Sequence, residues 1–432
     1  MRNINILGAG YVGLTLGIFI ANQGKKVNII DIDQSKIEQL KSGKSPVHEE
    51  GIQDALDFAI KNKNINFTSN TEIKSSLWVI AISYFPGKPE EFIDVIKNIK
   101  YDPEFIPTIM IRTTIPGGFI KEKIIPSLED HFGGKLDQKF HIVSAPERSL
   151  SGNAINELRD LPQIIGGSDD STKKASKAFE SLGIDVISLP TYESAELVKS
   201  FTNFSRLVQF NLSNYLGTLC SLHGVNEELL LKAIKDNYPR MDFLNVSGPG
   251  VGGFCLPKDA LVMHDSLSEN KELSKDFEEI ANFPLMQFNL NEQIIKYNAN
   301  KISLQIDKGS RILALGIAFK GFPHTDDTRD SVGVKIVNHL KTQNFNVEVF
   351  DLSVSQEKIN SLGYKYSDLN NLKDFDAILF LNNDRRYTDV INRCLLEDQI
   401  KKEYFIYDPW KIFLKNDRLI LEKSVNLSEQ KR

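Results

Sequence analysis

The feature that most constrains the fold is the glycine pattern Gly8-Ala-Gly-Tyr-Val-Gly13 near the start of the chain. The apolar run Asn3–Leu7 before it predicts a short buried strand, and the segment Leu14–Ala21 after it predicts a helix. A second predicted strand, Lys26–Asp31, ends in a carboxylate. A strand, a glycine turn, a helix and a strand with an acidic end predict a dinucleotide-binding βαβ unit, and therefore an α/β fold.

The glycine turn also predicts how a cofactor would be held. Gly8 makes the tight turn, Gly10 lets a pyrophosphate approach the backbone, and Gly13 packs the helix against the strand. Asp31 would accept a hydrogen bond from a ribose 2′-hydroxyl and repel a 2′-phosphate, which favours NAD over NADP. The alternative is a βαβ unit that binds no ligand. The predicted cofactor-binding residues of this unit are Gly8, Gly10, Tyr11, Val12, Gly13 and Asp31.

The rest of the chain divides into regions by its hydrophobic pattern. Short apolar runs that alternate with helical patterns continue the first region, at residues 77–82, 108–112, 140–143 and 184–189. A long helical pattern begins at Glu193, and a strand, a helix and a strand return after residue 301. We therefore expect two Rossmann-like, doubly wound α/β domains with parallel sheets, residues 1–192 and 301–432. A long helix and an all-α central domain, residues 193–300, would join them.

Composition and charge exclude some classes of protein. The 432 residues carry a net charge of −5, which argues against a nucleic-acid partner because phosphate binding needs a basic surface. No apolar run approaches the roughly 20 residues that span a bilayer, so no membrane partner is expected. The three cysteines are too far apart for a disulfide framework or a zinc site. We expect a cytoplasmic protein without a metal, in which Cys220 and Cys394 pack in apolar cores.

A second glycine-rich stretch, Gly248–Asp259, distinguishes Cys255 from the other two cysteines. Four glycines precede Cys255 within this stretch, so the backbone there can approach a ligand closely. Lys258 would favour the thiolate form of Cys255, and a thiolate can attack an electrophilic carbon such as that of an aldehyde. The alternative is a buried structural cysteine in a glycine-rich turn.

Polar residues at the ends of two predicted strands are further candidates for a site. Thr114 and Glu147 follow the strands at residues 108–112 and 140–143. The carboxyl ends of parallel strands form the ligand-binding edge of such a sheet, which makes both residues site candidates by position. A helix-capping threonine and a surface glutamate are the alternatives.

The helix that begins at Glu193 carries a polar stripe within an apolar pattern. Glu196, Lys199, Asn203 and Arg206 are three or four residues apart and share one face of the helix. Lys199 and Asn203 would place an ammonium group and an amide side by side over a substrate oxygen. A solvated stripe is the alternative.

The pattern after residue 301 repeats the opening unit with a different connecting turn. The strand Arg311–Gly316 leads into Ala318–Arg329, which lacks the Gly-x-Gly-x-x-Gly spacing. A nucleotide-like ligand held by Lys320 and Arg329 fits this turn better than a second dinucleotide. The turn also contains three potential metal ligands, which we interpret as part of a charged turn with helix-capping aspartates: His324, Asp326 and Asp327.

Six motifs span nearly the whole chain: Gly8–Gly13, Thr113-Thr114-Ile-Pro116, Ala145-Pro-Glu-Arg148, Glu196-Leu-Val-Lys199 with Asn203, Gly252–Asp259, and Ala318-Phe-Lys320 with Asp327-Thr-Arg329. In this order they resemble the UDP-glucose/GDP-mannose dehydrogenase family. The resemblance implies NAD as the cofactor and a UDP-sugar as the substrate. The helical middle section is the natural place for a subunit interface, so a homodimer or a higher homo-oligomer is expected.

Further residues resemble one branch of that family. Leu161–Gly167, Tyr238-Pro-Arg240 and Arg206 are similar to the branch that oxidises UDP-N-acetylhexosamines, whereas Lys258 is the residue expected in the UDP-glucose branch. The chain departs from the family pattern at three places, none of which removes a catalytic group. Tyr84-Phe85 occupies the position of a usual Thr-Pro pair. Phe254 occupies a position that is often a small residue or histidine, and Val332 replaces a usual proline.

The resemblance implies a four-electron oxidation of the C6 alcohol of a UDP-sugar to a carboxylate, with two NAD used in succession. Cys255 would add to the intermediate aldehyde, and the thioester formed by the second oxidation would be hydrolysed. Glu147 would position or deprotonate the water with help from Thr114, and Asp259 would tune the proton balance. The implied catalytic residues are Cys255, Lys199, Asn203, Glu147, Asp259 and Thr114. The uronate products of many relatives feed surface polysaccharides.

The same resemblance implies further binding residues. Beyond the opening unit, the cofactor would contact Thr114, Lys258 and Arg329. The implied substrate-binding residues are Glu147, Arg148, Lys199, Asn203, Arg206, Arg240, Gly252, Phe319 and Lys320. Three alternatives stay open: a UDP-glucose 6-dehydrogenase with the same mechanism, a two-electron hydroxy-acid dehydrogenase with Lys199 as proton acceptor, and a catalytically inactive nucleotide-sugar-binding protein.

Overall fold

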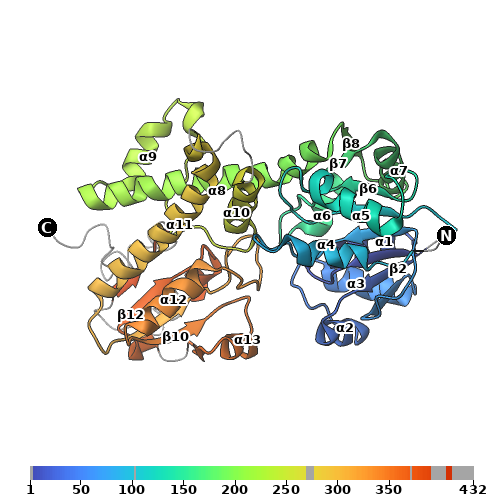
Figure 1. The fold of residues 1–432 in the computed structure, drawn as a ribbon. Coiled ribbons are helices and arrows are strands. Elements are labelled where there is room, and N and C mark those ends of the chain that lie inside the picture. The colour runs from blue at the N-terminus through green and yellow to red at the C-terminus, as the bar shows by residue number, and fades with distance from the viewer. Residues whose placement is uncertain (1–2, 102–103, 269–276, 370–371, 391–404, 411–432) are drawn as a thin grey trace. The chain divides into compact units, whose positions relative to one another are not determined.

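Two α/β units make up the described part of the chain (Figure 1). The computed structural model describes residues 3–101, 104–268, 277–369, 372–390 and 405–410. Unit 1 comprises Met1–Asn203 with Leu261–Asn282, and unit 2 comprises Phe204–Ala260 with Phe283–Arg432. Three helices contribute residues to both units: α8 (Tyr192–His223), α10 (Cys255–Ser268) and α11 (Glu278–Gln305). Cys394 and the C-terminal residues after Pro409-Trp410 lie outside the described residues.

Unit 1 is built on one sheet with the strand order β3-β2-β1-β4-β5-β6-β7-β8. Its strands are β1 (Ile4–Leu7), β2 (Val27–Ile30), β3 (Ile65–Thr68), β4 (Leu77–Ile80), β5 (Thr108–Ile111), β6 (His141–Ser144), β7 (Gln163–Gly167) and β8 (Val186–Leu189). All neighbouring pairs are parallel except β6 and β7. The prediction of a parallel sheet is wrong for that pair, because an apolar strand pattern carries no information about strand direction.

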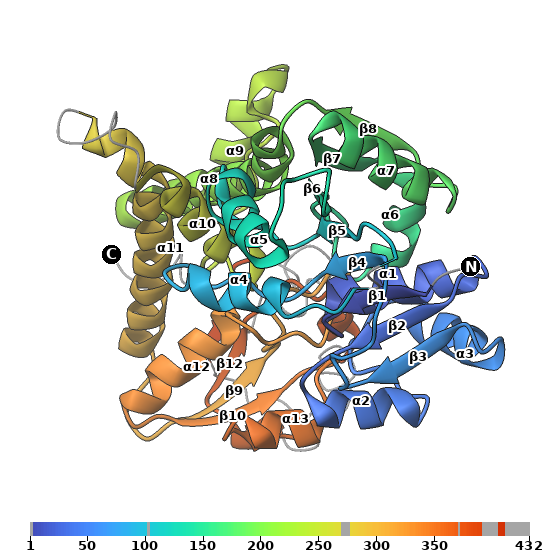
Figure 2. The ribbon, with the colours of Figure 1, turned by 45° about the vertical axis from the view of Figure 1, so that its right-hand side comes forward.

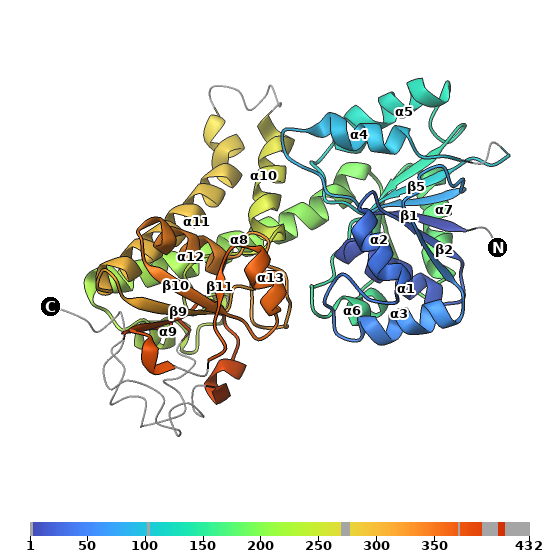
Figure 3. The ribbon, with the colours of Figure 1, turned by 90° about the horizontal axis from the view of Figure 1, so that it is seen from below.

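Helices cover both faces of this sheet, as a doubly wound fold requires. They are α1 (Tyr11–Asn22), α2 (Gln34–Lys41), α3 (Ile52–Lys61), α4 (Pro89–Lys97), α5 (Ile125–Phe132), α6 (Ala154–Asp160) and α7 (Asp169–Glu180), and a π-helical turn, η1 (Ile120–Ile124), precedes α5. Successive strand residues point to opposite faces, so Ile6 and Ile29 join the core under α1 and α3, whereas Leu7 and Ile30 join the core under α4 and α5. Figure 3 shows α4 and α5 on one side of the sheet and α1, α3 and α6 on the other.

A ladder of three asparagines fixes the register of the strands that carry the glycine turn. Asn5, Asn28 and Asn66 are in register on β1, β2 and β3. The amide of Asn28 donates to Asn5 over 2.8 Å, and the amide of Asn66 donates to Asn28 over 3.1 Å. A register slip by one residue would leave buried amides unpaired. The ladder therefore sets where Asp31, at the end of β2, meets the turn after β1.

Unit 2 contains a second parallel sheet, with the order β11-β10-β9-β12-β13. Its strands are β9 (Arg311–Leu315), β10 (Asn346–Phe350), β11 (Lys365–Tyr366), β12 (Ala377–Phe380) and β13 (Phe405–Tyr407). Its further helices are α9 (Glu227–Lys235), α12 (Val332–Thr342) and α13 (Gln356–Ser361), with short 3-10 turns η2 (Pro239–Met241) and η4 (Leu372–Asp374). Apolar residues of α12 pack on this sheet (Figure 2), as does the second half of α11 through Ile295, Ala299 and Ile302.

The expected fold class is confirmed: two Rossmann-like α/β parts and a helical region between them along the chain. The first five strands of unit 1 and the five strands of unit 2 share one order, 3-2-1-4-5, when the strands of each sheet are counted along the chain. Among the described residues, no helix is both long enough and apolar enough to cross a membrane.

Glu196, near the start of α8, attaches this helix to the segment that follows β5. Its carboxylate accepts hydrogen bonds from the backbone N–H of Gly118 over 2.7 Å and of Ile120 over 3.0 Å. The residue is only 2% exposed. Burial raises the pKa of Glu196 to about 7, although the two backbone hydrogen bonds act in the opposite direction. Folding therefore takes up a proton at this residue in mildly acidic solution.

This proton uptake predicts how stability depends on pH. Because the folded pKa lies above the unfolded one, the free energy of unfolding should fall as pH rises from about 4.5 to 7, by about 3 kcal/mol. Glu196→Gln should flatten this fall, since glutamine does not titrate. Urea denaturation across pH 4.5–8 measures the slope. Glu50→Gln, at an exposed position of the same unit, is the control and should keep this fall; an equal slope in Glu196→Gln and the wild type would contradict the prediction.

Candidate functional site

The glycine turn after β1 leaves space where a ligand could approach. Gly8 has φ +110°, and a Cβ there would lie 2.5 Å from the carbonyl oxygen of Ala81 at the end of β4. A Cβ on Gly13 would lie 2.0 Å from the carbonyl oxygen of Gly8, so the helix packs directly on the turn. A Cβ on Gly10, in contrast, would meet no atom within 4 Å. Packing therefore does not require a glycine at position 10, and the open space beside it would let a ligand approach the backbone.

The N-terminus of α1 can bind an anion. Tyr11 is the first helical residue, Val12 is the second, and the capping residue Gly10 offers no side-chain hydrogen bond. The first turn contains no acidic residue. Backbone N–H groups at the start of a helix, together with the positive end of the helix dipole, stabilise phosphate groups. The residues of this turn therefore fit the pyrophosphate of NAD.

Asp31 closes the turn and keeps capacity for a ribose. One carboxylate oxygen accepts the N–H of Ala9 over 2.8 Å, and the other accepts the N–H of Asp33 over 2.9 Å. A carboxylate has about four acceptor positions, so two backbone donors leave room for hydroxyl groups. Lys36 lies 3.9 Å away, at the edge of ion-pair distance. Asp31 thus fits the ribose of NAD.

The corresponding carboxylate of unit 2, Asp351 at the end of β10, is fully engaged. One oxygen accepts the N–H of Ile317 over 2.7 Å and of Ala318 over 2.9 Å. The other accepts the N–H of Ser353 over 2.7 Å and of Val354 over 3.0 Å. Burial raises the pKa of Asp351, against the effect of these four hydrogen bonds. With four backbone donors, Asp351 has a structural role, so the second unit is not a second dinucleotide site.

We expect Asp31→Ala to weaken NAD binding and cofactor selectivity, because hydrogen bonds to a carboxylate are lost and the repulsion of a 2′-phosphate disappears. Loss of a charged hydrogen bond corresponds to roughly 10- to 100-fold. The measurement is kcat/KM with NAD and with NADP. Asp33→Ala is the matched control: Asp33 caps α2 through the N–H of Ser35 and Lys36, so its loss should lower stability and not selectivity. Unchanged selectivity in Asp31→Ala would refute the ribose role.

The other candidates of unit 1 lie at the carboxyl ends of β5 and β6 and on α8. Thr114 follows Thr113, whose hydroxyl donates to the carbonyl of Ile82 over 2.7 Å. Lys199 is half-buried, and Asn203 is 4% exposed. With Glu196 also buried, the polar face of α8 is not the solvated stripe of the alternative interpretation. Arg206 is exposed and belongs to unit 2.

Glu147 is buried and bound to a residue that the sequence analysis did not select. One carboxylate oxygen pairs with the guanidinium of Arg112, and the other accepts the N–H of Arg148 and of Ser149, each over 2.8 Å. The surface-glutamate alternative is therefore excluded, since Glu147 is 9% exposed. The signal for Arg112 was present in the sequence: a charged residue directly after the apolar run of β5, next to Thr113-Thr114.

The cysteine loop of unit 2 is held by side chains of a distant helix. Asn291 on α11, fully buried, accepts the N–H of Val251 over 2.8 Å and donates to the carbonyl of Val251 over 2.9 Å. Farther along the loop, Gly253 donates its N–H to the carbonyl of Asp330 over 3.0 Å. Lys335 binds Asp330 and Glu292 of α11, each over 2.6 Å. Asn291 could not be selected from the sequence, because an asparagine within a helical pattern carries no sign of its partner.

The loop packs against the connecting turn of the second sheet. A Cβ on Gly252 would lie 2.9 Å from the backbone nitrogen of Val332, and a Cβ on Gly253 would lie 2.6 Å from the ring of Phe319. Glycine is therefore required at both positions for this close approach. Lys320 lies 5.3 Å from the centre of the Phe319 ring. The loop that leads to Cys255 thus packs beside two predicted substrate-binding residues, Phe319 and Lys320.

Phe254, one of the departures from the family pattern, has two cations close to its ring. The guanidinium of Arg329 is 4.7 Å from its ring centre and the ammonium of Lys258 is 5.6 Å away. Such distances allow cation–π attraction, which orders both side chains beside Cys255. Tyr84, another departure, is buried and packs edge-on against Phe92 and Phe119 in unit 1.

Cys255 is exposed and is the first residue of α10. A helix N-terminus and a nearby ammonium group both favour a thiolate. Lys258, one turn later, also binds the buried carboxylate of Asp259 over 2.7 Å. Cys220 is buried, as expected for a packing residue. The exposed position of Cys255 is the one that a nucleophile needs.

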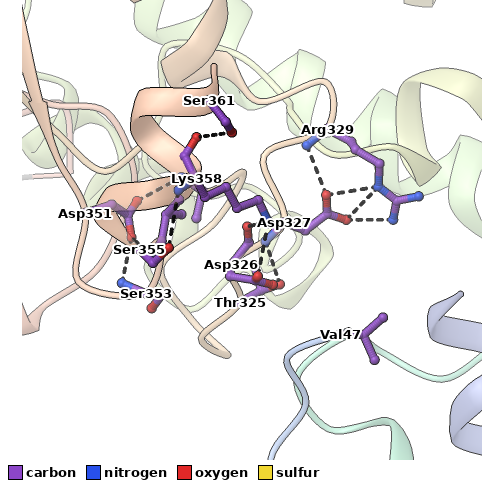
Figure 4. A network of polar contacts seen from close by, with 12 residues as sticks. Val47, Thr325, Asp326, Asp327, Arg329, Asp351, Ser353, Ser355, Lys358 and Ser361 are labelled. Carbon is purple, nitrogen blue, oxygen red and sulfur yellow. Dashed lines mark hydrogen bonds and ion pairs between the residues drawn. The ribbon is translucent and has the colours of Figure 1, made fainter. Parts of the chain in front are cut away.

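The acidic residues of the connecting turn bind cations of the chain. Asp327 forms a two-oxygen ion pair with Arg329, with a shortest distance of 2.7 Å, and Asp326 binds Lys358 over 3.1 Å (Figure 4). These contacts agree with a charged turn. Arg240 lies on η2, is exposed, and stacks on Tyr238 at 5.0 Å.

Comparison with known proteins decides the family. Three domain profiles of the UDP-glucose/GDP-mannose dehydrogenase family match in order: the NAD binding domain over residues 2–182, the central domain over 193–282 and the UDP binding domain over 313–415. The chain belongs to this family. It is therefore an NAD-dependent oxidoreductase that acts on the CH–OH group of a UDP-sugar. The resemblance drawn from the six motifs is confirmed.

Relatives with two different sugar preferences are similarly close. A UDP-N-acetyl-D-mannosamine dehydrogenase of Methanococcus vannielii is 27% identical over 403 residues, covering 90% of this chain and 87% of the relative. A UDP-glucose 6-dehydrogenase of Bacillus subtilis is 26% identical over 408 residues, covering 88% and 87%. Among solved structures, the UDP-D-ManNAc dehydrogenase of Pyrococcus horikoshii has a TM-score of 0.81 with 25% identity, covering 99% of each chain.

Proposed function

We propose that this chain oxidises C6 of UDP-N-acetyl-D-mannosamine, or a closely related UDP-N-acetylhexosamine, to the uronate through a covalent intermediate on Cys255. The observation that carries the proposal is the exposed thiol of Cys255 at the start of α10, in a glycine loop packed against the turn of the UDP binding domain. The preference for a hexosamine rests on the motifs Leu161–Gly167 and Tyr238-Pro-Arg240 and on the relatives with that activity.

The residues of the chain supply the chemistry of the carbonyl intermediates. NAD would supply the hydride acceptor for both oxidations. The thiolate of Cys255 adds to the aldehyde carbon, and the resulting thiohemiacetal is oxidised to a thioester. Water then forms a bond to C6, the C6–S bond breaks, and the electron pair returns to sulfur. Lys199 and Asn203 stabilise the oxyanions of these steps, and removal of one such donor lowers the rate on the order of 10²-fold or more.

The remaining site assignments belong to the same proposal. Glu147, with Thr114, acts on the hydrolytic water, and Asp259, which pairs with Lys258, tunes the proton balance of the lysine and the water in the site. Arg148, Arg206, Arg240, Phe319 and Lys320 contribute to binding of the UDP-sugar. Arg329 and Lys258, both within cation–π distance of the Phe254 ring, contribute to binding of the cofactor. A division into domains at residues 192 and 300 and a cytoplasmic location are also proposed.

A UDP-glucose 6-dehydrogenase with the same mechanism is the second candidate, and two observations favour it. Lys258 is the residue expected in that branch, and the Bacillus subtilis relative has that activity. An NADH assay across UDP-N-acetylmannosamine, UDP-N-acetylglucosamine, UDP-glucose and GDP-mannose separates the candidates. A hexosamine with the highest kcat/KM supports the first, and UDP-glucose supports the second.

The covalent route predicts two NADH for each UDP-sugar consumed. Cys255→Ser should bind the UDP-sugar but release no uronate, because an alcohol oxygen cannot form the thioester. Absorbance at the NADH band and chromatography of the products measure both quantities. Cys220→Ser is the matched control, since this cysteine is buried in the same unit. Full turnover to uronate by Cys255→Ser, or one NADH per substrate in the wild type, would refute the covalent route; the latter would indicate a two-electron dehydrogenase.

We further propose that the chain forms a homodimer through α8. Leu212, Tyr215 and Leu222 recur at helical spacing and are 47%, 48% and 65% exposed. Such a stripe is more apolar than a monomer surface usually is, and a second copy would bury it. Light scattering of the purified protein should give twice the chain mass, and Leu222→Glu should lower it. A wild-type monomer at micromolar concentration would contradict the proposal.

A further inference from the structure

Arg112 is a charged residue in an apolar setting at the carboxyl end of β5. Its side chain is 1% exposed, and its guanidinium lies 5.9 Å from the ring centre of Phe179. Burial lowers the pKa of Arg112 to about 9, so it remains a cation near neutral pH. A buried cation without anionic partners is strongly unfavourable, which makes its contacts informative.

The guanidinium of Arg112 joins two elements of the sheet edge. One terminal nitrogen pairs with the carboxylate of Glu147, which follows β6, and the other donates to the side-chain carbonyl of Gln163 at the start of β7 over 2.6 Å. The amide of Gln163 donates in turn to the carbonyls of Pro146 and Ile164, over 3.3 and 2.7 Å. Gln163 therefore orients Arg112, and Arg112 orients Glu147.

Both oxygens of Glu147 have donors. One faces Arg112, and the other accepts two backbone N–H groups at 2.8 Å. The N–H of Glu147 itself donates to the carbonyl of Arg112 over 3.3 Å. These contacts fix the direction of the carboxylate and stabilise its ionised form. The pair lies at the carboxyl ends of two adjacent parallel strands, which is the ligand-binding edge of a doubly wound sheet.

We propose that Arg112 is a positioning residue for hydrolysis of the thioester, through its ion pair with Glu147. This inference rests on the proposed function. Arg112 holds Glu147 ionised and in one orientation, so the carboxylate can accept a hydrogen bond from the attacking water. The water oxygen bonds to C6, the C6–S bond breaks, and the proton of the water passes to solution. The two hydride transfers do not involve Glu147 and do not depend on the pair.

The test compares Arg112→Met, which removes the cation, with Arg112→Lys, which keeps it. Rapid-quench reactions are run with NAD and one UDP-sugar at a time, either UDP-N-acetylmannosamine or UDP-glucose. Arg112→Met should form the first two NADH at close to the wild-type rate. Hydrolysis should then slow by tenfold or more, so that the acyl group accumulates on Cys255 and appears by mass spectrometry. In a plot of hydrolysis rate against pH, the rate falls on the acidic side as the carboxylate is protonated. This acidic limb should move to higher pH by one unit or more in Arg112→Met. Arg112→Lys should restore part of the rate and the original limb.

Two further variants keep the test decisive if Arg112→Met folds poorly. Gln163→Leu leaves the charge in place and should slow hydrolysis without moving the acidic limb. Arg311→Met is the matched control, because Arg311 pairs with Glu348 over 2.8 Å in unit 2; it should leave the balance between oxidation and hydrolysis unchanged. Equal slowing of oxidation and hydrolysis in Arg112→Met, or a wild-type acidic limb, would overturn the proposal. A wild type that forms no acyl-enzyme would overturn the proposed function as well.

Discussion

A carboxylate at the end of the second strand closes the first turn of both α/β units, and the geometry of each site depends on this interaction. In unit 1, Asp31 accepts the N–H of Ala9, and in unit 2, Asp351 accepts the N–H of Ile317. The difference between the two lies in the number of donors. Asp351 accepts four backbone hydrogen bonds and is saturated, whereas Asp31 accepts two and keeps acceptor positions for a ribose. The same motif thus leaves acceptor positions open in one unit and fills all of them in the other.

The loops that carry the candidate chemistry are attached by long-range hydrogen bonds from side chains to the backbone. Glu196 holds the segment after Thr114, and Asn291 holds the segment before Cys255. Both anchoring residues are buried, so each bond forms where water cannot compete. This arrangement gives irregular backbone a defined position without a regular strand or helix. The chemistry of the site therefore depends on residues that would not touch a substrate.

Local signals in the sequence predicted the opening unit well. The strand, the glycine turn and Asp31 are close together in the chain, and each has a composition that few other structures share. The alternation of strands and helices predicted two α/β regions but no strand order, and it did not include β3 or β7. The antiparallel direction of β7 could not be predicted either, because a short apolar run reads the same in both directions. The division of the chain at residues 192 and 300 stays a prediction.

The partners of individual side chains could not be predicted in the same way. The pairing of Arg112 with Glu147 spans 35 positions and that of Asn291 with Val251 spans 40, so neither leaves a periodic signal. A polar residue in a buried pattern reveals that a partner exists and not which residue it is. Arg112 could have been selected on that ground, as a charge at the end of an apolar strand.

The double hydrogen bond of Asn291 links the loop that precedes Cys255 to a remote apolar core. The same helix that carries Asn291 continues through Ile295, Ala299 and Ile302, which pack on the second sheet. A volume change among those aliphatic residues would tilt the helix and displace the loop backbone at Val251. Thiol alkylation rates at Cys255 should thus report repacking far away in the sequence, and engineering of the second sheet for heat resistance would also alter the reactivity of the sulfur.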